Sequence, residues 1–378
     1  MRILIAPNSM KGSIDAFQFA DIVAEAFQSV SNDFEIRKLP VADGGDYTGP
    51  VLSRALNGIS VSVETEDPLG RKLNATYFRA GKTAIIEMAS ASGFTLLTTK
   101  EANPWITTSR GTGIMIQHAW QNGCREILLG VGGSATVDGG IGLLGALGFV
   151  FYDHKGFTLS ATPESMHRIE RIVIPASLSD FPKIRILCDV NNPLLGDNGA
   201  AKIFGPQKGA DPNCVERLEL GLTHWISVLE TFGKRSLSPM DGMGAAGGIA
   251  SGLVAFLGGE MVMGGPYILD ALQIDDHLLW SQLVITGEGK ADAQSLSLKA
   301  PIAVAMRAQK LGRPVIALTG AHDSSVKYPF DAIFSLSTGP TSLEQSIADA
   351  PQLLYSLAVQ IAKLLNYSKQ ICREPNKC

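Results

Sequence analysis

Residues 126–140 read EILLGVGGSATVDGG, an apolar run that leads into a glycine-rich loop with one carboxylate, Asp138. A continuous apolar run of this length is typical of a strand buried on both faces of a parallel sheet. Similar runs, each ending in glycine or small polar residues, recur at 2–9, 184–192, 282–290, 314–322 and 332–339. Helical patterns lie between several of them, including one that Ser13 can cap and another at 299–311. This alternation predicts an α/β fold with a Rossmann-like, doubly wound parallel sheet.

Two tracts depart from the alternation and predict a second α/β domain inserted into the first. Residues 60–98 alternate apolar and polar side chains around a Pro-Leu-Gly turn, which indicates antiparallel strands, with AGKT at 80–83 as a hairpin turn. Residues 193–281 are rich in glycine and helix signals. We therefore assign residues 1–62, 106–192 and 282–378 to the Rossmann-like domain, and residues 63–105 and 193–281 to the second domain.

The composition excludes several classes of protein. The formal net charge is only −4, which argues against a broad nucleic-acid-binding face. The five cysteines form no CxxC pair and the six histidines are scattered, so we expect neither a disulfide framework nor a zinc site, and a cytoplasmic location. Residues 242–259 carry no charge but are rich in glycine, so we expect a buried helix and no membrane span. The sequence leaves open whether the protein is an oligomer.

The loops after the predicted strands are the expected ligand sites, because ligands bind beyond the carboxyl ends of parallel strands. Lys11 precedes a predicted helix start, where free N–H groups and a lysine together form an anion site. In the glycine-rich loop, bare backbone can approach phosphate oxygens and hydroxyl groups add donors. The residues concerned are Gly132, Gly133, Ser134 and Thr136. A solvated lysine and a purely structural turn are the alternatives that these features leave open.

Acidic and basic side chains accumulate in the same loops. The acidic residues are Asp43, Asp46, Asp138, Asp189, Glu288 and Asp292. The basic residues are Lys11, Arg110, Lys208, Lys290 and Lys299. Carboxylates converging on one sheet edge suit magnesium and phosphate chemistry, although any single one also fits a turn or a helix cap. A mixture of acids and bases on glycine loops favours phosphoryl transfer over hydride transfer.

A dinucleotide-binding interpretation competes with this one. Gly130, Gly132 and Ala135 match GxGxxA, and Asp153 ends a predicted strand further along the chain. The protein would then be a nicotinamide-dependent dehydrogenase of a small hydroxy acid. Two features oppose it, because the intervening helix would be short and Asp138 would place negative charge near the pyrophosphate.

Taken in order, these loops resemble those of the bacterial class I glycerate kinases. The resemblance covers about residues 1–340 and rests on APNSMKGS, VADGGD, TTSRGTG, GVGGSAT, VDGG, CDVNNPLLG, IFGPQKGA, GAAGGIASGL and VITGEGKADAQS. It implies a Rossmann-like domain with a second α/β domain. It also implies ATP-dependent, magnesium-assisted phosphorylation of D-glycerate, which in this class typically yields 2-phosphoglycerate.

The chain departs from the family pattern at several positions. Asn8 stands where the family usually has Asp, Asp46 and Tyr47 replace Glu and Gly, and Val137 stands where Asn is common. The SLK before the helix at 299 keeps the lysine of the family's HGK but loses its histidine and glycine. These changes leave open a catalytically weakened, glycerate-kinase-like sensor.

The resemblance and the chemistry of the side chains together give an expected site. Arg110 offers a bidentate fork for the substrate carboxylate. Asp189 ends a buried strand, which fixes its position for accepting the hydroxyl proton, and Lys11 stabilises the transferred group. Ser134 and Asp43 complete the expected substrate site. We expect phosphate or ATP at Gly132, Gly133, Ser134, Thr136, Lys290 and Lys299, and magnesium at Glu288 and Asp292.

Overall fold

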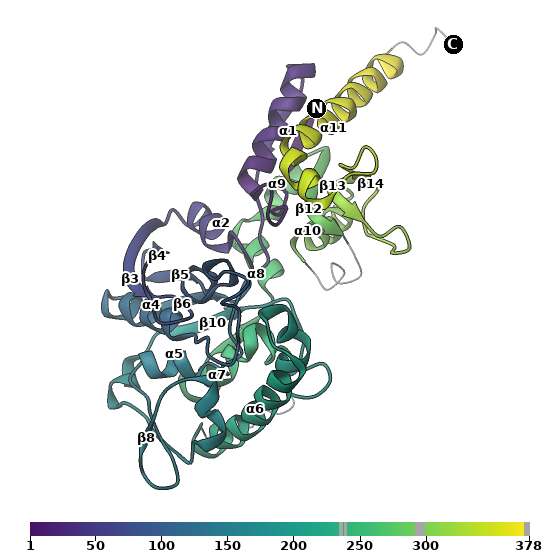
Figure 1. Ribbon diagram of the computed structural model, residues 1–378. Helices are drawn as coiled ribbons and strands as arrows, with labels where there is room; N and C mark the ends of the chain where they lie inside the picture. The colour runs from purple at the N-terminus through teal and green to yellow at the C-terminus, as the bar shows by residue number, and fades with distance from the viewer. Residues whose placement is uncertain (234–236, 238–239, 292–298, 374–378) are drawn as a thin grey trace. The chain divides into compact units, whose positions relative to one another are not determined.

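The computed structural model describes residues 1–233, 237, 240–291 and 299–373. The chain divides into two compact units, of which the first combines Met1–Asp43 with Gly265–Cys378 and the second comprises Gly44–Gly264 (Figure 1). We refer to them as unit 1 and unit 2. Unit 1 is therefore built from both ends of the chain, and unit 2 from one continuous middle segment.

Unit 1 contains a five-stranded sheet in the order β14-β13-β12-β1-β2, and every neighbouring pair is parallel. The predicted apolar runs form four of its strands. The strands are β1 (Arg2–Ile5), β2 (Glu35–Lys38), β12 (Leu283–Ala291), β13 (Val315–His322) and β14 (Ala332–Ser335). This sheet confirms the predicted doubly wound α/β class.

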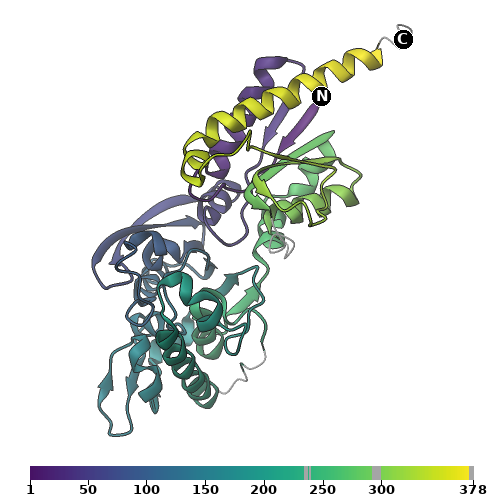
Figure 2. The same cartoon turned by 45° about the vertical axis from the view of Figure 1, so that its right-hand side comes forward.

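Helices cover both faces of the unit 1 sheet. They are α1 (Ala16–Val30), α8 (Gly264–Ala271), α9 (Ile274–Trp280), α10 (Ala300–Lys310) and α11 (Leu343–Arg373). Figure 2 shows α11 lying along α1. Phe19 of α1, Leu354 of α11 and Ile3 of β1 belong to one apolar core. The contacts of α9 with β1 and of α10 with β12 cover the opposite face. Asp15 caps α1 through a capping box with Gln18, so the predicted cap at Ser13 is wrong by two residues.

Unit 2 contains a six-stranded sheet in the order β11-β10-β6-β5-β4-β3. Its strands are β3 (Ile59–Glu66), β4 (Lys72–Ala80), β5 (Thr83–Glu87), β6 (Glu126–Gly130), β10 (Lys183–Leu187) and β11 (Glu260–Val262). The predicted antiparallel strands and the hairpin turn after Ala80 are present, and β5 continues the sheet by pairing with β6 in parallel. The sheet is therefore mixed, with its parallel part at β5, β6, β10 and β11.

The helices of unit 2 enclose a single large apolar core. They are α2 (Thr48–Ala55), α3 (Ala89–Ser92), α4 (Arg110–Gln121), α5 (Ile141–Ala146), α6 (Pro212–Gly233) and α7 (Ile249–Leu257). Met115 of α4, Trp225 of α6 and Leu253 of α7 are fully or almost fully buried in it, and each buried side chain of this kind contributes about 1.5–3 kcal/mol. The uncharged tract at 242–259 contains α7, which confirms the predicted buried helix. Among the described residues, no helix is long and apolar enough to cross a membrane.

The observed division differs from the predicted domain boundaries. Residues 106–192, which we assigned to the Rossmann-like domain, supply β6 and β10 to the unit 2 sheet. Residues 44–62 likewise belong to unit 2, and residues 265–281 belong to unit 1. A buried parallel strand has the same apolar signature in any sheet, so the sequence pattern does not identify the sheet that a strand joins.

The topology contradicts the dinucleotide-binding interpretation. The strand that ends before Asp153 is β7 (Val150–Tyr152), which lies in a separate antiparallel sheet with β8 (Thr158–Leu159) and β9 (Arg171–Val173). β6, α5 and β7 therefore do not form the βαβ unit that the fingerprint requires. The carboxylate of Asp153 accepts the backbone N–H groups of Lys155 and Phe157 in a turn, which is the role of a turn carboxylate.

Candidate active site

The parallel strands of unit 2 end in one row. Gly130 at the end of β6 is paired with Glu87 of β5 on one side and with Leu187 of β10 on the other. The glycine-rich loop after Gly130 and the loop that carries Asp189 therefore begin at the same edge of the sheet. The structure thus brings together two of the segments expected at the site, and it adds Glu87 to them.

Part of the bare backbone in the glycine-rich loop approaches the protein itself. A side chain at Gly132 would collide with the backbone of Gly45, and one at Gly139 would collide with the indole of Trp225. The exposed part of the loop is limited to Gly132, Gly133 and Ser134, which are half-buried. Thr136 is fully buried, so its hydroxyl is not accessible to a ligand in this arrangement.

Asp138 is fully buried and holds the glycine-rich loop to the start of α4. Its carboxylate accepts the N–H and the O–H of Ser109, both at 2.7 Å, and the N–H groups of Gly140 and Gly142 at 3.1 and 3.2 Å. Burial raises the pKa of Asp138, and these hydrogen bonds oppose the rise. Asp138 therefore supports the loop from inside and does not face a ligand.

Lys208 reaches the same loop from the 3₁₀ turn Pro206–Lys208, and it is 4% exposed. Its Nζ donates to Ser134 Oγ at 2.8 Å and to the carbonyl oxygen of Thr136 at 2.7 Å. Burial lowers the pKa of Lys208 to about 7, and the negative charge of Asp138 acts in the opposite direction. The sequence identified Lys208 as a basic loop residue but gave no indication of this burial.

Glu87 is a site residue that the sequence analysis missed. Its Oε1 accepts the N–H of Gly49 at 2.9 Å at the start of α2. Burial, together with the nearby carboxylate of Asp46, raises the pKa of Glu87 to about 7 despite the opposing hydrogen bond from Gly49. Asp46 Oδ1 lies 3.1 Å from the Cβ position of Gly133. Glu87 lies at the end of a buried strand, and Asp189 follows the end of another. The rule that carboxylates at the ends of buried parallel strands are candidate site residues therefore also identifies Glu87.

The raised pKa of Glu87 predicts a pH-dependent stability difference. In the unfolded chain Glu87 ionises near pH 4.5, and in the folded protein near pH 7. Its contribution to the free energy of unfolding therefore declines as pH rises from about 4.5 to 7, because the buried group must then ionise. Across this pH range, we expect the free energy of unfolding of Glu87→Gln to increase by roughly 2 kcal/mol relative to that of the parent protein, measured by urea unfolding. The exposed Glu64→Gln is the control, and parallel curves for Glu87→Gln and its parent would contradict the prediction.

Arg110 and Asp189 both belong to unit 2. Arg110 is the first residue of α4, beside Ser109, and its Nε donates to Glu66 Oε2 at 3.1 Å. Because a guanidinium has five N–H donors, this ion pair occupies one and orients the rest. Asp189 is half-buried and follows β10 by two residues. Arg110 thus lies next to Ser109, which hydrogen-bonds to the glycine-rich loop, and Asp189 follows a strand that pairs with β6.

Unit 1 carries the remaining described candidates at the carboxyl edge of its own sheet. Asn8 follows β1, and its Nδ2 donates to Asp43 Oδ2 at 3.1 Å. Glu288 and Lys290 lie in the last part of β12, where Glu288 is 6% exposed. The Cβ position of Gly289 between them is 3.4 Å from the backbone nitrogen of Lys11. Lys11 and Asp43 thus lie on loops of unit 1 that are adjacent to β1 and β12, and Glu288 lies in β12 itself.

The site loops that we expected at one sheet edge thus lie at the edges of two different sheets. Arg110, Ser134 and Asp189 lie in unit 2, and Lys11, Asp43 and Glu288 lie in unit 1. Lys299 is half-buried and immediately precedes α10 in unit 1. Asp292 lies outside the described residues. The reason for the difference is the sheet assignment of β6 and β10, which carry the loops of Ser134 and Asp189.

The structure shows the surroundings of three positions at which the chain departs from the family pattern described above. Tyr47 has φ 65°, a left-handed conformation that favours glycine, the residue usual at this position in that family. Val137 is fully buried in the core of unit 2, so the change from Asn removes a polar group from an apolar environment. Asn8 supplies an amide that donates to Asp43, where Asp would add a second carboxylate.

The pairing of Asn8 with Asp43 predicts a cation-dependent effect. In Asn8→Asp two carboxylates would face each other across the present 3.1 Å hydrogen bond, and the free energy of unfolding should fall by about 2 kcal/mol at neutral pH. Magnesium should restore more stability to this variant than it adds to the parent, measured as thermal unfolding midpoints. Asn8→Ala serves as the control without added charge. Equal magnesium responses of the parent and Asn8→Asp would contradict the prediction.

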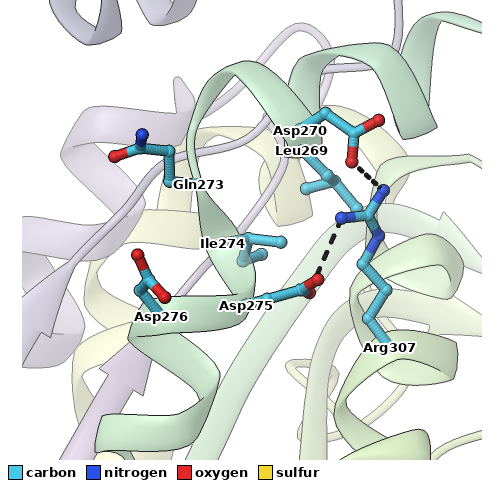
Figure 3. A pocket seen from close by; sticks show the side chains of 7 residues that line it. All are labelled: Leu269, Asp270, Gln273, Ile274, Asp275, Asp276 and Arg307. Atoms are coloured by element: carbon cyan, nitrogen blue, oxygen red, sulfur yellow. Dashed lines mark hydrogen bonds and ion pairs between the residues drawn. The ribbon is translucent and has the colours of Figure 1, made fainter.

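A small polar cavity in unit 1 lies apart from these residues. It has a volume of about 200 Å³ and is lined by Leu269, Asp270, Gln273, Ile274, Asp275, Asp276 and Arg307. Figure 3 shows the Arg307 guanidinium between two carboxylates, with Nη2 2.5 Å from Asp270 and Nη1 3.5 Å from Asp275. The arginine thus connects α10 to α8 and α9, and the cavity contains none of the expected site residues.

The described residues place no group of three or more His, Cys, Asp or Glu side chains in a metal-binding arrangement. Mg²⁺ is commonly held by one or two carboxylates together with substrate phosphates and waters, so a magnesium site need not contain such a group. Of the two predicted magnesium ligands, Glu288 is described and lies in β12 of unit 1.

Comparisons with known proteins identify the family of this chain. The sequence profile of the Glycerate kinase family matches residues 3–366. The chain is 39% identical to the Glycerate 2-kinase of Escherichia coli K12, over 93% of this chain and 94% of that protein. It is 38% identical to the Glycerate kinase of Bacillus cereus, over 96% and 97% of the two chains. A crystal structure assigned to glycerate kinase 2 of Salmonella typhimurium LT2 superimposes with a TM-score of 0.83 at 37% identity, covering 98% of this chain and 99% of that one. The chain therefore belongs to the glycerate kinase family.

Proposed function

We propose that this protein transfers the γ-phosphoryl group of ATP to the 2-hydroxyl of D-glycerate, giving 2-phosphoglycerate and ADP. The observation that carries the proposal is the similarity over 93% of the chain to a protein named Glycerate 2-kinase. The acidic and basic loops at the ends of parallel strands support it, because phosphoryl transfer relies on positioned charges and donors more than on covalent chemistry.

In unit 2, Arg110 binds the carboxylate of glycerate and Asp189 accepts the proton of the reacting hydroxyl. A guanidinium matches a carboxylate with two parallel N–H donors, and the ion pair with Glu66 holds Arg110 in place. Asp189 follows the end of β10 by two residues, and a carboxylate is the usual acceptor for a hydroxyl proton in phosphoryl transfer. Asp43, which the sequence predicts as a substrate-site residue, belongs to unit 1.

The phosphate groups interact with glycine backbone and lysines. Gly133 offers an N–H group and Ser134 a hydroxyl in the exposed part of the loop, whereas the N–H of Gly132 donates to the carbonyl oxygen of Gly44 at 3.2 Å. Thr136 is fully buried, and its carbonyl oxygen accepts from Lys208, so the predicted phosphate contact at Thr136 is not supported. In unit 1, Lys11, Lys290 and Lys299 supply positive charge. One positioned donor of this kind is worth about 3 kcal/mol of the barrier.

Magnesium is the expected metal, with Glu288 and Asp292 as its protein ligands. When bound, the ion neutralises charge on the phosphates of ATP. Glu288 is almost completely buried at the carboxyl end of β12, a position where an ionised carboxylate must be compensated by a cation or by hydrogen bonds.

A coupled assay for ADP formation with D-glycerate tests the function. We expect turnover with D-glycerate and MgATP, and phosphorus NMR should identify 2-phosphoglycerate as the product. L-glycerate and omission of magnesium are the controls. Absence of ADP despite binding of both ligands would favour the sensor alternative, and 3-phosphoglycerate as product would contradict the proposed regiochemistry.

The remaining assignments follow the proposed reaction. The partner is a small organic acid, and we place the enzyme in the cytoplasm, where its substrate ATP is found. Cys124, Cys188 and Cys214 are free cysteines, which fits a reducing compartment.

A further inference from the structure

Lys208 contacts the glycine-rich loop from the buried side of that loop. Its Nζ makes its two hydrogen bonds to this loop, to Ser134 Oγ at 2.8 Å and to the Thr136 carbonyl oxygen at 2.7 Å. The residue is 4% exposed, and the ring of Phe204 lies 6.0 Å from its Nζ. Lys208 therefore does not reach solvent and acts on any ligand only through the loop.

The protonation state of Lys208 determines what the Ser134 hydroxyl can do. An ammonium group only donates hydrogen bonds, so Ser134 Oγ must accept from it and must direct its own proton elsewhere. Ser134 is half-buried and borders the exposed glycines at 132 and 133. The hydroxyl proton is then available to an acceptor outside the loop.

A neutral amine would change this arrangement. It keeps N–H donors for the Thr136 carbonyl oxygen and gains a lone pair, which can accept the Ser134 O–H. The hydroxyl would then turn inward, and its proton would be lost to a ligand.

We propose that protonated Lys208 is a positioning residue that holds the Ser134 hydroxyl as a hydrogen-bond donor to an anionic oxygen of the bound ligand. This inference rests on the proposed function, because it deepens the role of the same loop. The ligand oxygen belongs to a phosphate of ATP or to the carboxylate of glycerate, and both are anionic acceptors.

The electrostatics of the site make the switch accessible near neutral pH. Burial lowers the pKa of Lys208 to about 7, so both protonation states are populated there. Asp138 is the charged group on the loop side that favours the ammonium form, and Ser134 and Thr136 contribute only polar atoms. Burying an ammonium group costs folding free energy, and an apolar side chain at position 208 would avoid that cost. A charged residue at this buried position therefore favours a functional role.

The test compares Lys208→Met, Ser134→Ala and the double variant with the parent protein. We expect kcat/KM to fall by about 10- to 100-fold in each single variant, with the double variant no lower than the worse of the two. Separate KM values for ATP and D-glycerate identify which ligand receives the donor. Lys202→Met is the matched control, since Lys202 is exposed and pairs with Asp197 at 2.8 Å, and it should retain full activity.

The pH profile gives a readout that loss of structure alone would not produce. The kcat/KM of the parent should decline about tenfold per pH unit above the pKa of Lys208, whereas Lys208→Arg, which stays charged, should show no such decline. The parent profile needs no variant, so it tests the proposal even if a substitution at 208 prevents folding.

Several outcomes would overturn the inference. They are multiplicative effects of the two substitutions, an unaltered Ser134→Ala, a folded Lys208→Met with full activity, or a flat parent profile between pH 6 and 9. If the parent forms no ADP with D-glycerate, the proposed function fails, and calorimetric binding of a magnesium-bound, non-hydrolysable ATP analogue and of D-glycerate takes the place of kcat/KM. Equal affinities of the parent, Lys208→Met and Ser134→Ala for both probes would then reject the role of Lys208 separately.

Discussion

Asp189→Asn should lower kcat by about 100- to 10,000-fold in the ADP-coupled assay, because an amide does not accept the proton of the reacting hydroxyl. The change preserves the shape of the side chain, and Asp189 is half-buried in the loop after β10. We therefore expect the thermal unfolding midpoint and the affinity for MgATP to stay close to those of the parent.

The same loop region offers a control for this prediction. Asp197 is largely exposed and pairs with Lys202 at 2.8 Å, so Asp197→Asn should leave kcat unchanged. Near-normal turnover in Asp189→Asn would exclude Asp189 as the base. Glu87 would then become the next residue to test, because it lies in the same row of strand ends and its pKa is raised to about 7.

Asp138→Ala should lower the free energy of unfolding by about 3–5 kcal/mol, which is the cost of breaking a buried, hydrogen-bonded charge network. The substitution would leave the Ser109, Gly140 and Gly142 N–H groups without their acceptor in a fully buried region. It would also remove the negative charge that favours the ammonium form of Lys208. Urea unfolding at pH 7 measures the effect.

Two further variants complete this test. Asp138→Asn keeps the volume of the side chain and one acceptor oxygen, so we expect a smaller loss than for the alanine variant. Asp153→Ala removes a carboxylate that accepts two backbone N–H groups in an exposed turn, and we expect it to cost less than about 1 kcal/mol. If Asp138→Ala unfolds at the same urea concentration as Asp153→Ala, the interpretation of Asp138 as the internal support of the loop is wrong.

The sequence predicted the elements that depend on local pattern. The apolar runs became β1, β6, β10, β12, β13 and β14, and the uncharged tract became the buried helix α7. The periodicity of apolar residues and the position of turn residues are properties of neighbouring residues, so they can be recognised along the chain. Family membership was recognisable for the same reason, because the loop motifs are short and contiguous.

Which strands share a sheet is set by contacts that the local sequence pattern does not contain. β6 and β10 pair with each other and with β5 and β11, and this pairing moves Ser134 and Asp189 into a different unit from Lys11 and Glu288. The burial of individual side chains was also not predictable from the sequence, since nothing in the local pattern distinguishes buried Lys208 from exposed Lys202. Strand pairing and burial both arise from contacts between residues far apart in the chain. Because of those contacts, the expected site residues lie at the edges of two sheets, and the Lys208 amino group is buried against the glycine-rich loop.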